Sequence, residues 1–473
     1  MLLNSIFRNF RWWGVTKKIA FVGIFFLVFY ITLFGFLLYT DRYVDDLDGN
    51  LPYQYPVWGW DSPEYIRLAD HLIGDNFFSL DGQYPEILRT PAYPILLALT
   101  KILFGSYKVV ILFQIILTLW SGFLIYKIGK KLYDSRVGAI AGGIFLLNPS
   151  TIFNSLVYLT DAPFTFLIVL IAYMLFFKDT SNVEVSGLAN GALIAGLTLA
   201  VATLTRPIAL YLPVLVVAGY LVLFRARGLR SNIKVLIFFV IGFAVIVFPW
   251  MLRNKIETGN FTVSSISLYN LTYFNTPDFL AKKFGADSIE LSSYNEKLHA
   301  SPLHEARPMV SLTELQKLPL SFLGLYPVPY ALYHVSSLPT FFLSSSVRYI
   351  VQVTDNSTVK ELFSLKENAP NILSLLKGGK FLELFETLRH QLLFTVDRVA
   401  LLVITILAFI APLFLPKGVR MQGLFLIALI LYFAILTGPA SIPRYRLPAD
   451  PFILLLASVS FLSLWDFLKK KKV

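Results

Sequence analysis

Residues Ile19–Tyr39 read IAFVGIFFLVFYITLFGFLLY, an uninterrupted apolar run of about the length that crosses a bilayer. Basic residues precede this run, and no small-x-small cleavage pattern follows it. The apolar core of a signal peptide has only ~7–15 residues. We therefore expect a retained first transmembrane helix.

Nine further apolar runs are long enough to span, so the sequence predicts an all-α polytopic membrane protein with about ten transmembrane helices. They lie at 107–129, 137–155, 160–177, 187–205, 207–224, 233–252, 396–415, 421–438 and 450–468. The 473 residues are 56% hydrophobic and 15% charged, whereas soluble domains are about half apolar and about a quarter charged. The chain has no cysteine, which excludes disulfides, thiolate metal ligands and cysteine nucleophiles.

The basic residues predict the orientation of these helices. Six short segments hold 19 of the 41 Lys and Arg residues, namely 1–18, 127–136, 178–186, 225–234, 416–420 and 469–473. All six become cytoplasmic, as the positive-inside rule requires, if the apolar run 89–104 does not cross. We therefore expect a juxtamembrane or re-entrant segment at 89–104, both termini in the cytoplasm, and a location in the cytoplasmic (inner) membrane. The net charge of +12 then follows from topology and implies no nucleic-acid partner.

This topology divides the chain into three parts. Residues 1–255 form an N-terminal transmembrane module whose first outer loop, 40–106, carries the functional residues. Residues 256–395 form a large extracytoplasmic region, interfacial in places because prolines interrupt its apolar stretches. Residues 396–473 form the C-terminal transmembrane helices.

The first outer loop contains DSPEYIRLAD, Asp61–Asp70, a polar helix start in an apolar chain. Two interpretations of Asp61 are compatible: it caps a helix over 62–73 in a capping-box-like arrangement with Glu64, or it is a catalytic carboxylate. Asp161 allows the same two interpretations, because it precedes Pro163 at the start of an apolar run.

Several arginines are expected on the same membrane face as Asp61. They are Arg89, Arg206, Arg253 (beside Asn254), Arg444 and Arg446 (on either side of Tyr445). Each could anchor a helix end at the membrane interface. Arginine also binds phosphate through forked, charge-assisted hydrogen bonds, and an outer-leaflet phosphate ligand would account for the clustering.

Other kinds of site are not indicated. The five histidines are scattered, and the sequence contains no metal-binding histidine pair, phosphate-binding glycine loop or nucleophile elbow. We expect no metal site and no cofactor, while the sequence leaves a divalent cation open. Spacings such as Gly138/Gly142 indicate close helix packing rather than chemistry.

The ordered set of motifs resembles the GT-C superfamily of polytopic glycosyltransferases, in particular the bacterial protein mannosyltransferases and the aminoarabinose transferase of lipid A. The motifs are D-x-x-x-Y-x-x-x-A (Asp61, Tyr65, Ala69), a basic-x-P segment (Arg89, Pro91, Tyr93, Pro94) ending in Phe104-Gly105, P-W-x-x-R-N (Pro249–Asn254) and R-Y-x-x-P (Arg444–Pro448). The family often has a second acid after the first, where this chain has Ser62. The resemblance covers most of 1–255 and 395–468, and none is recognised over 256–395.

The resemblance implies a donor sugar on a polyprenyl phosphate, undecaprenyl in bacteria or dolichyl elsewhere, used from the outer leaflet among membrane lipids. It implies transfer to a hydroxyl of an unknown glycolipid, polysaccharide or protein, with inversion and with Asp61 as general base. Asp161 would orient the acceptor or the base. Donor-phosphate contacts are expected from Arg89, Arg253, Arg444 and Arg446, and substrate contacts from Glu64, Tyr65, Tyr93, Arg206, Asn254 and Tyr445.

Two alternatives remain open at this point. A transporter or flippase for a lipid-linked saccharide would use Asp161 and Arg206 to line a pathway, but such folds usually contain internal repeats, and none is evident. A polysaccharide polymerase or ligase acting on the same lipid would share the arginines, and the Asp61 region argues against it.

Overall fold

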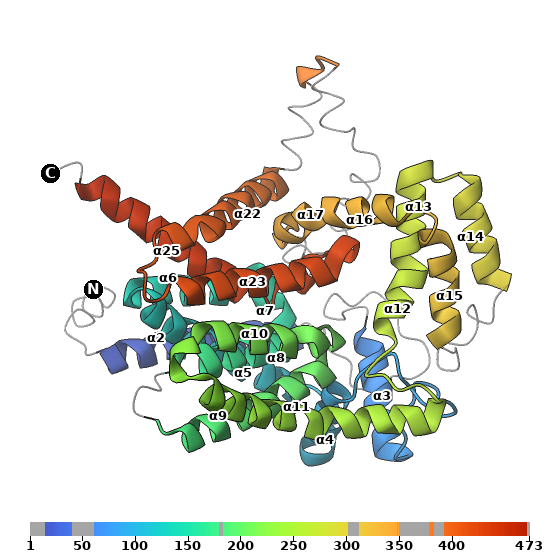
Figure 1. Ribbon diagram of the computed structural model, residues 1–473, viewed down its shortest axis with the longest axis horizontal. Coiled ribbons are helices and arrows are strands. Elements are labelled where there is room, and N and C mark those ends of the chain that lie inside the picture. The colour runs from blue at the N-terminus through green and yellow to red at the C-terminus, as the bar shows by residue number, and fades with distance from the viewer. Residues whose placement is uncertain are drawn as a thin grey trace.

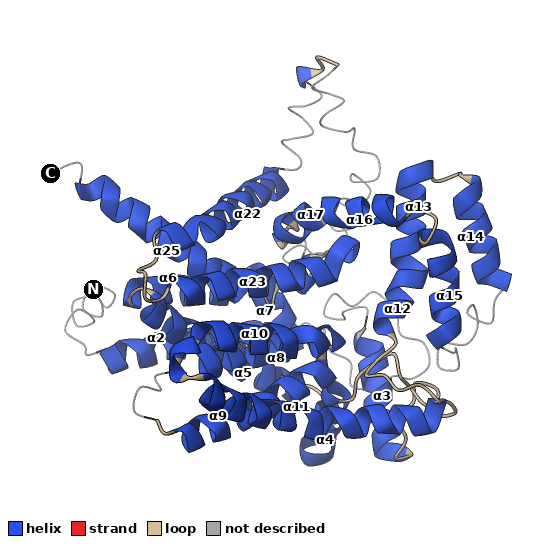
Figure 2. Ribbon diagram, in the orientation of Figure 1, coloured by secondary structure: helices blue, strands red, loops and turns tan. Residues whose placement is uncertain are grey.

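The computed structural model describes residues 15–39, 61–178, 183–300, 312–347, 349, 378–382 and 392–470. Within these ranges every regular element is a helix (Figure 2). The expected all-α fold class is therefore confirmed.

Seven described helices are long and apolar enough to cross a membrane. They are α2 (Val15–Tyr39), α5 (Val109–Leu132), α9 (Val185–Thr205), α11 (Leu229–Thr258), α22 (Leu392–Ile410), α23 (Arg420–Thr437) and α25 (Asp450–Lys470). The chain is thus a multi-pass membrane protein.

The other three predicted spans are helical but broken or short. α6 (Ser135–Leu147) and α7 (Pro149–Ser155) pass the length test only as a pair, bent by 58°. The bend follows from Pro149, which cannot continue a helix, and from the extended Asn148, whose side chain caps α7. The remaining two are α8 (Asp161–Ala172) with the π-helical turn η1 (Tyr173–Phe177), and the 3-10 turn η2 (Pro207–Tyr211) with α10 (Leu212–Leu223).

The apolar run 89–104 forms only one short helix, α4 (Ala92–Phe104), of 13 residues. At 1.5 Å per residue it is about 20 Å long, whereas the hydrocarbon core of a bilayer is about 30 Å thick. Its length therefore agrees with the prediction that this segment does not cross.

The two ends of the helix bundle carry different segments. The spanning helices lie side by side, with α3 (Ser62–Gly74) at one end, together with α13 (Thr276–Phe284), α14 (Ile289–Ala300) and α15 (Leu312–Leu323) (Figure 1). At the opposite end Arg136, at the start of α6, pairs with Asp466 near the end of α25 at 2.9 Å. Segments assigned to one side of the membrane by charge therefore share one end of the bundle.

Glycines allow two pairs of spanning helices to approach closely. A Cβ on Gly138 would lie 2.3 Å from the carbonyl oxygen of Tyr126, and one on Gly196 would lie 2.0 Å from that of Phe239. α5 packs on α6 at the first site and α9 on α11 at the second. The spacing of Gly138 and Gly142 thus reflects helix packing.

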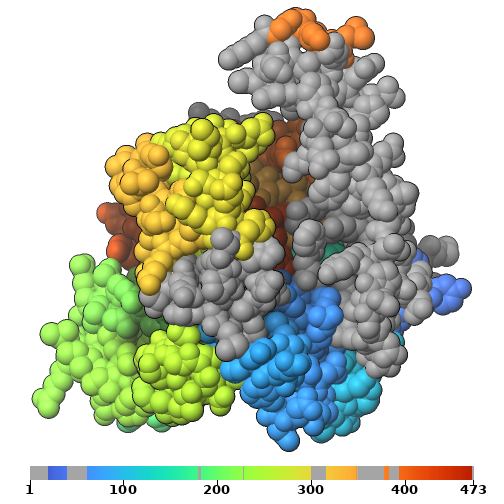
Figure 3. Space-filling view, turned by 90° about the vertical axis from the view of Figure 1, so that its right-hand side faces the viewer, coloured from blue at the N-terminus to red at the C-terminus, as the bar shows by residue number. Residues whose placement is uncertain are grey.

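The described part of 256–395 includes three helices at the α3 end of the bundle (Figure 1). α12 (Ile266–Asn270), the π-helical turn η4 (Leu271–Asn275) and α13–α15 share a small apolar core around Phe279, Tyr294 and Phe322. α16 (Pro327–Ser336) and α17 (Leu338–Leu343) then lead the chain back to the end of α23. Seen from the end of the bundle that carries α3, the surface has separate parts formed by the α13–α15 group, by α11 and by α3 (Figure 3). The division at 256 and 395 stays a prediction.

Candidate active site

Asp61 lies at the start of α3, whose first turn contains Pro63. It occupies the N-cap position, yet its side chain makes no capping hydrogen bond. Instead its carboxylate accepts from Arg89 Nη2 at 2.7 Å and from Arg444 Nη2 at 2.5 Å. The carboxylate is therefore directed at two guanidinium groups and away from the backbone it was expected to cap.

Arg89 connects Asp61 with the rest of α3. Its Nε donates to Glu64 at 2.7 Å, one helical turn after Asp61, and its guanidinium lies 5.6 Å from the centre of the Tyr65 ring. The Tyr65 ring meets the Tyr93 ring edge-on, with centroids 5.2 Å apart. The structure thus brings together five residues that the sequence assigned to donor and acceptor binding or catalysis.

A second carboxylate–guanidinium pair lies beside the first. Asp161, the first residue of α8, is buried with 2% of its side chain exposed, and it pairs with Arg206. Arg206 follows α9 directly, in extended backbone before Pro207. Its guanidinium lies over the Tyr445 ring at 5.3 Å.

Tyr445 joins the two pairs. It belongs to α24 (Pro443–Arg446), and the Arg444 guanidinium covers it at 5.0 Å from the ring centre. The ring of Tyr445 therefore contacts the guanidinium that holds Asp161 and the one that holds Asp61. Because five separate segments of the chain, around residues 61, 89, 161, 206 and 444, supply these groups, only the folded bundle assembles the site.

The charges of this cluster balance, with three carboxylates (Asp61, Glu64, Asp161) and three guanidiniums (Arg89, Arg206, Arg444). Burial raises the pKa of Asp61, but Arg444 and Arg89 outweigh it and hold the pKa well below its ordinary value. Asp61 is therefore ionised at neutral pH, and each of its two oxygens accepts from one arginine.

Arg444 retains hydrogen-bonding capacity. Its side chain is 14% exposed, and its Nε is buried with no partner. A buried donor without a partner costs free energy in a folded protein. The guanidinium is thus able to take up an additional acceptor.

Two residues predicted to bind the donor phosphate lie elsewhere. Arg446 is 2% exposed, pairs with Asp450 at 2.8 Å and donates to the carbonyls of Phe342 and Ser344. It therefore holds α24 and α25 to the end of α17, and its role as a phosphate ligand stays a prediction. Arg253 donates to the carbonyls of Phe78 and Glu86, and the neighbouring Asn254 donates to that of Thr262.

Sequence reasoning missed two polar residues that support this site. Glu86 is buried and accepts from the N–H groups of Leu88 and Arg89, while its Oε2 has no partner. Gln114, within the apolar α5, accepts from the Tyr93 hydroxyl and donates to the carbonyl of Val157 at 2.8 Å. An isolated Gln in an apolar stretch was the available signal for Gln114, whereas Glu86 lies in a polar loop that offered no such signal.

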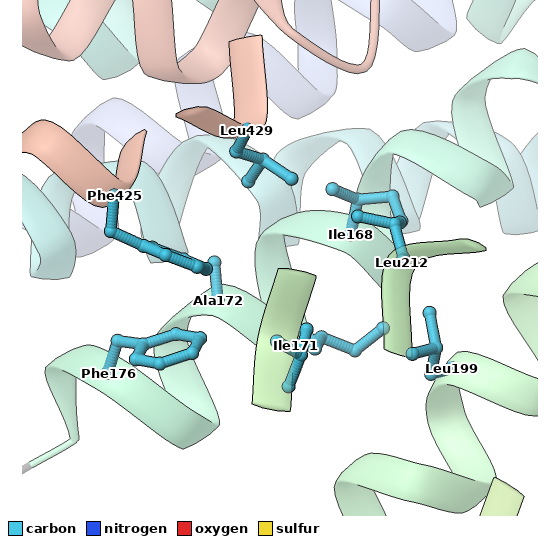
Figure 4. Close-up of a pocket in the computed structure, with 9 residues that line it drawn as sticks. Ile168, Ile171, Ala172, Phe176, Leu199, Leu212, Phe425 and Leu429 are labelled. Carbon is cyan, nitrogen blue, oxygen red and sulfur yellow. The ribbon is translucent and has the colours of Figure 1, made fainter. Parts of the chain in front are cut away.

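A small apolar cavity lies deeper in the bundle (Figure 4). Its volume is about 20 Å³. Its lining comes from α8, η1, α9, α10 and α23, and includes Ile168, Leu199, Leu212, Phe425 and Leu429. Ile168 is seven residues after Asp161, a rise of about 10 Å along α8. The cavity has room for about one water molecule and no polar side chain to hold it, so it is not a substrate site.

Among the described residues no three His, Asp or Glu side chains gather to hold a metal ion.

Residues 89–252 match a family model described as dolichyl-phosphate-mannose-protein mannosyltransferase. The resemblance to the GT-C glycosyltransferases is confirmed over this segment. The segment is about a third of the chain and includes Arg89, Asp161 and Arg206. No curated protein matches the chain.

Two solved structures have a similar arrangement of helices over most of this chain. One is the oligosaccharyltransferase AglB from Archaeoglobus fulgidus, in complex with an inhibitory peptide and a dolichol-phosphate; it is 15% identical, with 97% of this chain and 52% of AglB covered and a TM-score of 0.47. The other is ArnT from Cupriavidus metallidurans bound to undecaprenyl phosphate; it is 13% identical, with 92% and 77% covered and a TM-score of 0.40. The chain spans about half the length of the archaeal oligosaccharyltransferase.

Proposed function

We propose that this protein is a membrane glycosyltransferase that moves a sugar from a polyprenyl-phosphate donor to an acceptor hydroxyl outside the cytoplasm. The observation that carries the proposal is Asp61 held between Arg89 and Arg444, at the end of the bundle that also carries α13–α15. The family match over 89–252, whose description names a lipid-phosphate sugar donor, supports the same reaction class.

The arginines supply a phosphate site in this proposal. The sugar donor is a phosphodiester whose two non-bridging oxygens share one negative charge, and the polyprenyl phosphate that leaves is a monoester. A guanidinium can donate two parallel hydrogen bonds to either one. Arg444 has an unpartnered Nε available, and Arg89 lies on the other side of the Asp61 carboxylate. A lipid phosphate that draws both guanidiniums toward itself would replace Asp61 as their partner.

That exchange would turn Asp61 into a base. While both arginines are paired with Asp61, they lower its pKa and make the carboxylate a weak base. Once the phosphate replaces the carboxylate as the partner of these arginines, the pKa of Asp61 rises toward its ordinary value. The donor would thus bind first and prepare the base for the acceptor.

The reaction itself is a single displacement at the anomeric carbon. Asp61 takes the proton of the acceptor hydroxyl, whose oxygen forms a bond to that carbon. The bond between the carbon and the phosphate oxygen breaks, and its electron pair leaves with the polyprenyl phosphate. Arg89 and Arg444 stabilise the charge that grows on the leaving group. One displacement inverts the configuration at the anomeric carbon.

Asp161 and Arg206 form the second part of the proposed site. Asp161 is almost fully buried and already paired, so it is suited to orient the acceptor or Asp61 rather than to exchange protons with solvent. Through Tyr445, Arg206 is positioned next to the phosphate-binding Arg444. Glu64, Tyr65 and Tyr93 would line the same substrate site.

We place the site on the outer face of the inner membrane, with both termini in the cytoplasm. The cysteine-free chain permits a direct labelling experiment. Exposed Ala286, between α13 and α14, is expected to react from outside as Ala286→Cys. Exposed Ser135, at the other end of the bundle, is expected not to react as Ser135→Cys. The reverse labelling pattern would show that the predicted topology is inverted.

Binding of undecaprenyl phosphate to the detergent-purified protein tests the phosphate site. We expect the wild type to bind and Arg444→Gln to bind at least tenfold more weakly, since a hydrogen bond to a charged group contributes about 1.5–3 kcal/mol. Arg136→Gln, which removes an arginine at the other end of the bundle, should bind as the wild type does. Equal losses in both variants, or no binding by the wild type, would contradict the proposal.

A further inference from the structure

The motif Pro249–Asn254 lies at the outer end of α11, and the proposed reaction assigns it no contact with substrate. Its polar side chains face the backbone of other segments. Trp250 donates to the carbonyl of Val263 at 2.9 Å, and buried Asn254 donates to that of Thr262 at 2.8 Å. These bonds fold the chain that follows α11 back against the helix end.

Arg253 reaches in the other direction, to the segment that precedes Arg89. Its Nη1 donates to the carbonyl of Glu86 at 2.9 Å and its Nη2 to that of Phe78 at 3.3 Å. Its guanidinium lies 5.7 Å from the centre of the Phe78 ring, which packs edge-on against Trp250. One arginine thereby fixes both ends of the segment Phe78–Glu86, whose ends are also joined by a hydrogen bond from Glu86 N to the Phe78 carbonyl at 2.9 Å.

The turn after α11 holds the next two residues of the same segment. Ser265 N donates to the carbonyl of Ile87 at 3.0 Å, and Ser264 Oγ donates to that of Leu88 at 2.6 Å. Consecutive carbonyls from Glu86 to Leu88 are therefore bound by residues at or just after the end of α11.

Arg89 comes directly after this fixed backbone. Its own N–H and that of Leu88 are bound by the carboxylate of Glu86, so the backbone is also fixed from within. The side chain of Arg89 then extends to Asp61 and Glu64, both at 2.7 Å. The direction of this side chain is set by a backbone that Arg253 holds in place.

We propose that Arg253 is a positioning residue that holds the segment Phe78–Leu88 against the end of α11, and so keeps Arg89 where it meets Asp61 and the donor phosphate. This inference rests on the proposed function for the ligand that Arg89 would bind. It differs from the expectation that Arg253 binds phosphate, since three of its hydrogen bonds already go to Glu86, Phe78 and Asn254.

A double-mutant cycle on undecaprenyl phosphate binding separates the two roles of Arg253. Arg253→Met keeps an apolar stem for packing and removes the donors. We expect it to weaken binding severalfold when Arg89 is present, and to cause no further loss in the Arg89→Met background. An equal loss in both backgrounds would mean that Arg253 binds the phosphate itself, and no loss in either would mean that it does not position Arg89.

Hydrogen exchange without ligand tests the clamp independently of the proposed function. Arg253→Met should increase exchange in peptides covering residues 78–89, where the amides of Glu86, Leu88 and Arg89 are hydrogen-bonded. Lys255→Met is the matched control, because Lys255 lies on the same helix end and donates to the Gly259 carbonyl instead. Unchanged exchange in Arg253→Met would overturn the inference. A faster exchange combined with unaltered lipid binding in Arg89→Met would leave the clamp standing and contradict the phosphate role of Arg89.

Discussion

Replacing Asp61 by asparagine is expected to abolish sugar transfer and to tighten the binding of the lipid phosphate. The carboxylate accepts one hydrogen bond from each of two arginines, at 2.7 and 2.5 Å. A phosphate that recruits these arginines must displace a charged partner in the wild type, but only a neutral amide in Asp61→Asn. A hydrogen bond to a charged group contributes about 1.5–3 kcal/mol. Recovering the lower limit of one such bond makes the lipid bind about tenfold more tightly.

The assay for this prediction is the Kd of undecaprenyl phosphate in detergent at fixed ionic strength, because charge interactions are screened by salt. Asp466→Asn is the matched control: Asp466 is also paired with an arginine, but at the opposite end of the bundle. Its Kd should equal that of the wild type. An Asp61→Asn variant that binds the lipid with unchanged or lower affinity would refute competition between Asp61 and phosphate for the arginines.

Three further predictions concern stability. Gly196→Ala should lower the melting temperature in detergent because its Cβ would meet backbone, whereas Gly191→Ala, which has open space, should not; equal effects would contradict the close packing of α9 on α11. Burial raises the pKa of the Glu86 carboxyl, and the hydrogen bonds from backbone N–H groups only partly offset this effect. The folded protein therefore disfavours the charged carboxylate, so its free energy of unfolding decreases as the pH rises through the raised pKa. Glu86→Gln should therefore raise the melting temperature relative to the wild type, and the increase should be larger at pH 8 than at pH 5. The same increase at both pH values would refute this prediction. Arg446→Met leaves Asp450 buried without its charged partner and should lose about 3–5 kcal/mol of stability; a well-folded variant with weakened lipid binding would instead favour a phosphate role for Arg446.

Hydropathy predicts much of this fold because the bilayer leaves few choices. All ten predicted spans are helical, and the short α4 lies where prolines interrupt an apolar run. The length and periodicity of an apolar run cannot predict where a helix bends, as at Asn148, or where it changes from α-helix to π-helix, as at η1. Those details depend on packing between helices that are distant in sequence.

The site was predictable as a set of residues and less so as a set of contacts. Acidic and basic residues on the predicted outer face identified Asp61, Arg89, Asp161, Arg206 and Arg444, which the structure brings together. The sequence could not assign a partner to each arginine, since pairing depends on how the helices pack: Arg89 and Asp61 are 28 residues apart, whereas Arg444 and Asp61 are 383 apart.

Arg446 and Glu86 are two residues whose surroundings the sequence could not predict. Arg446 is only two residues from Arg444, but two residues rotate a helix by about 200°, so Arg446 points into the protein toward Asp450. Glu86 looked like an ordinary loop acid, and only its burial shows that it supports Arg89.

The decisive measurement is the release of undecaprenyl phosphate from a panel of undecaprenyl-phosphate sugars, with cell-envelope lipids as acceptor. The purified wild type is expected to consume at least one donor and to transfer its sugar with inversion. Asp61→Asn should bind that donor and release nothing. Release by Asp61→Asn at a rate near that of the wild type would contradict the assignment of Asp61 as the base.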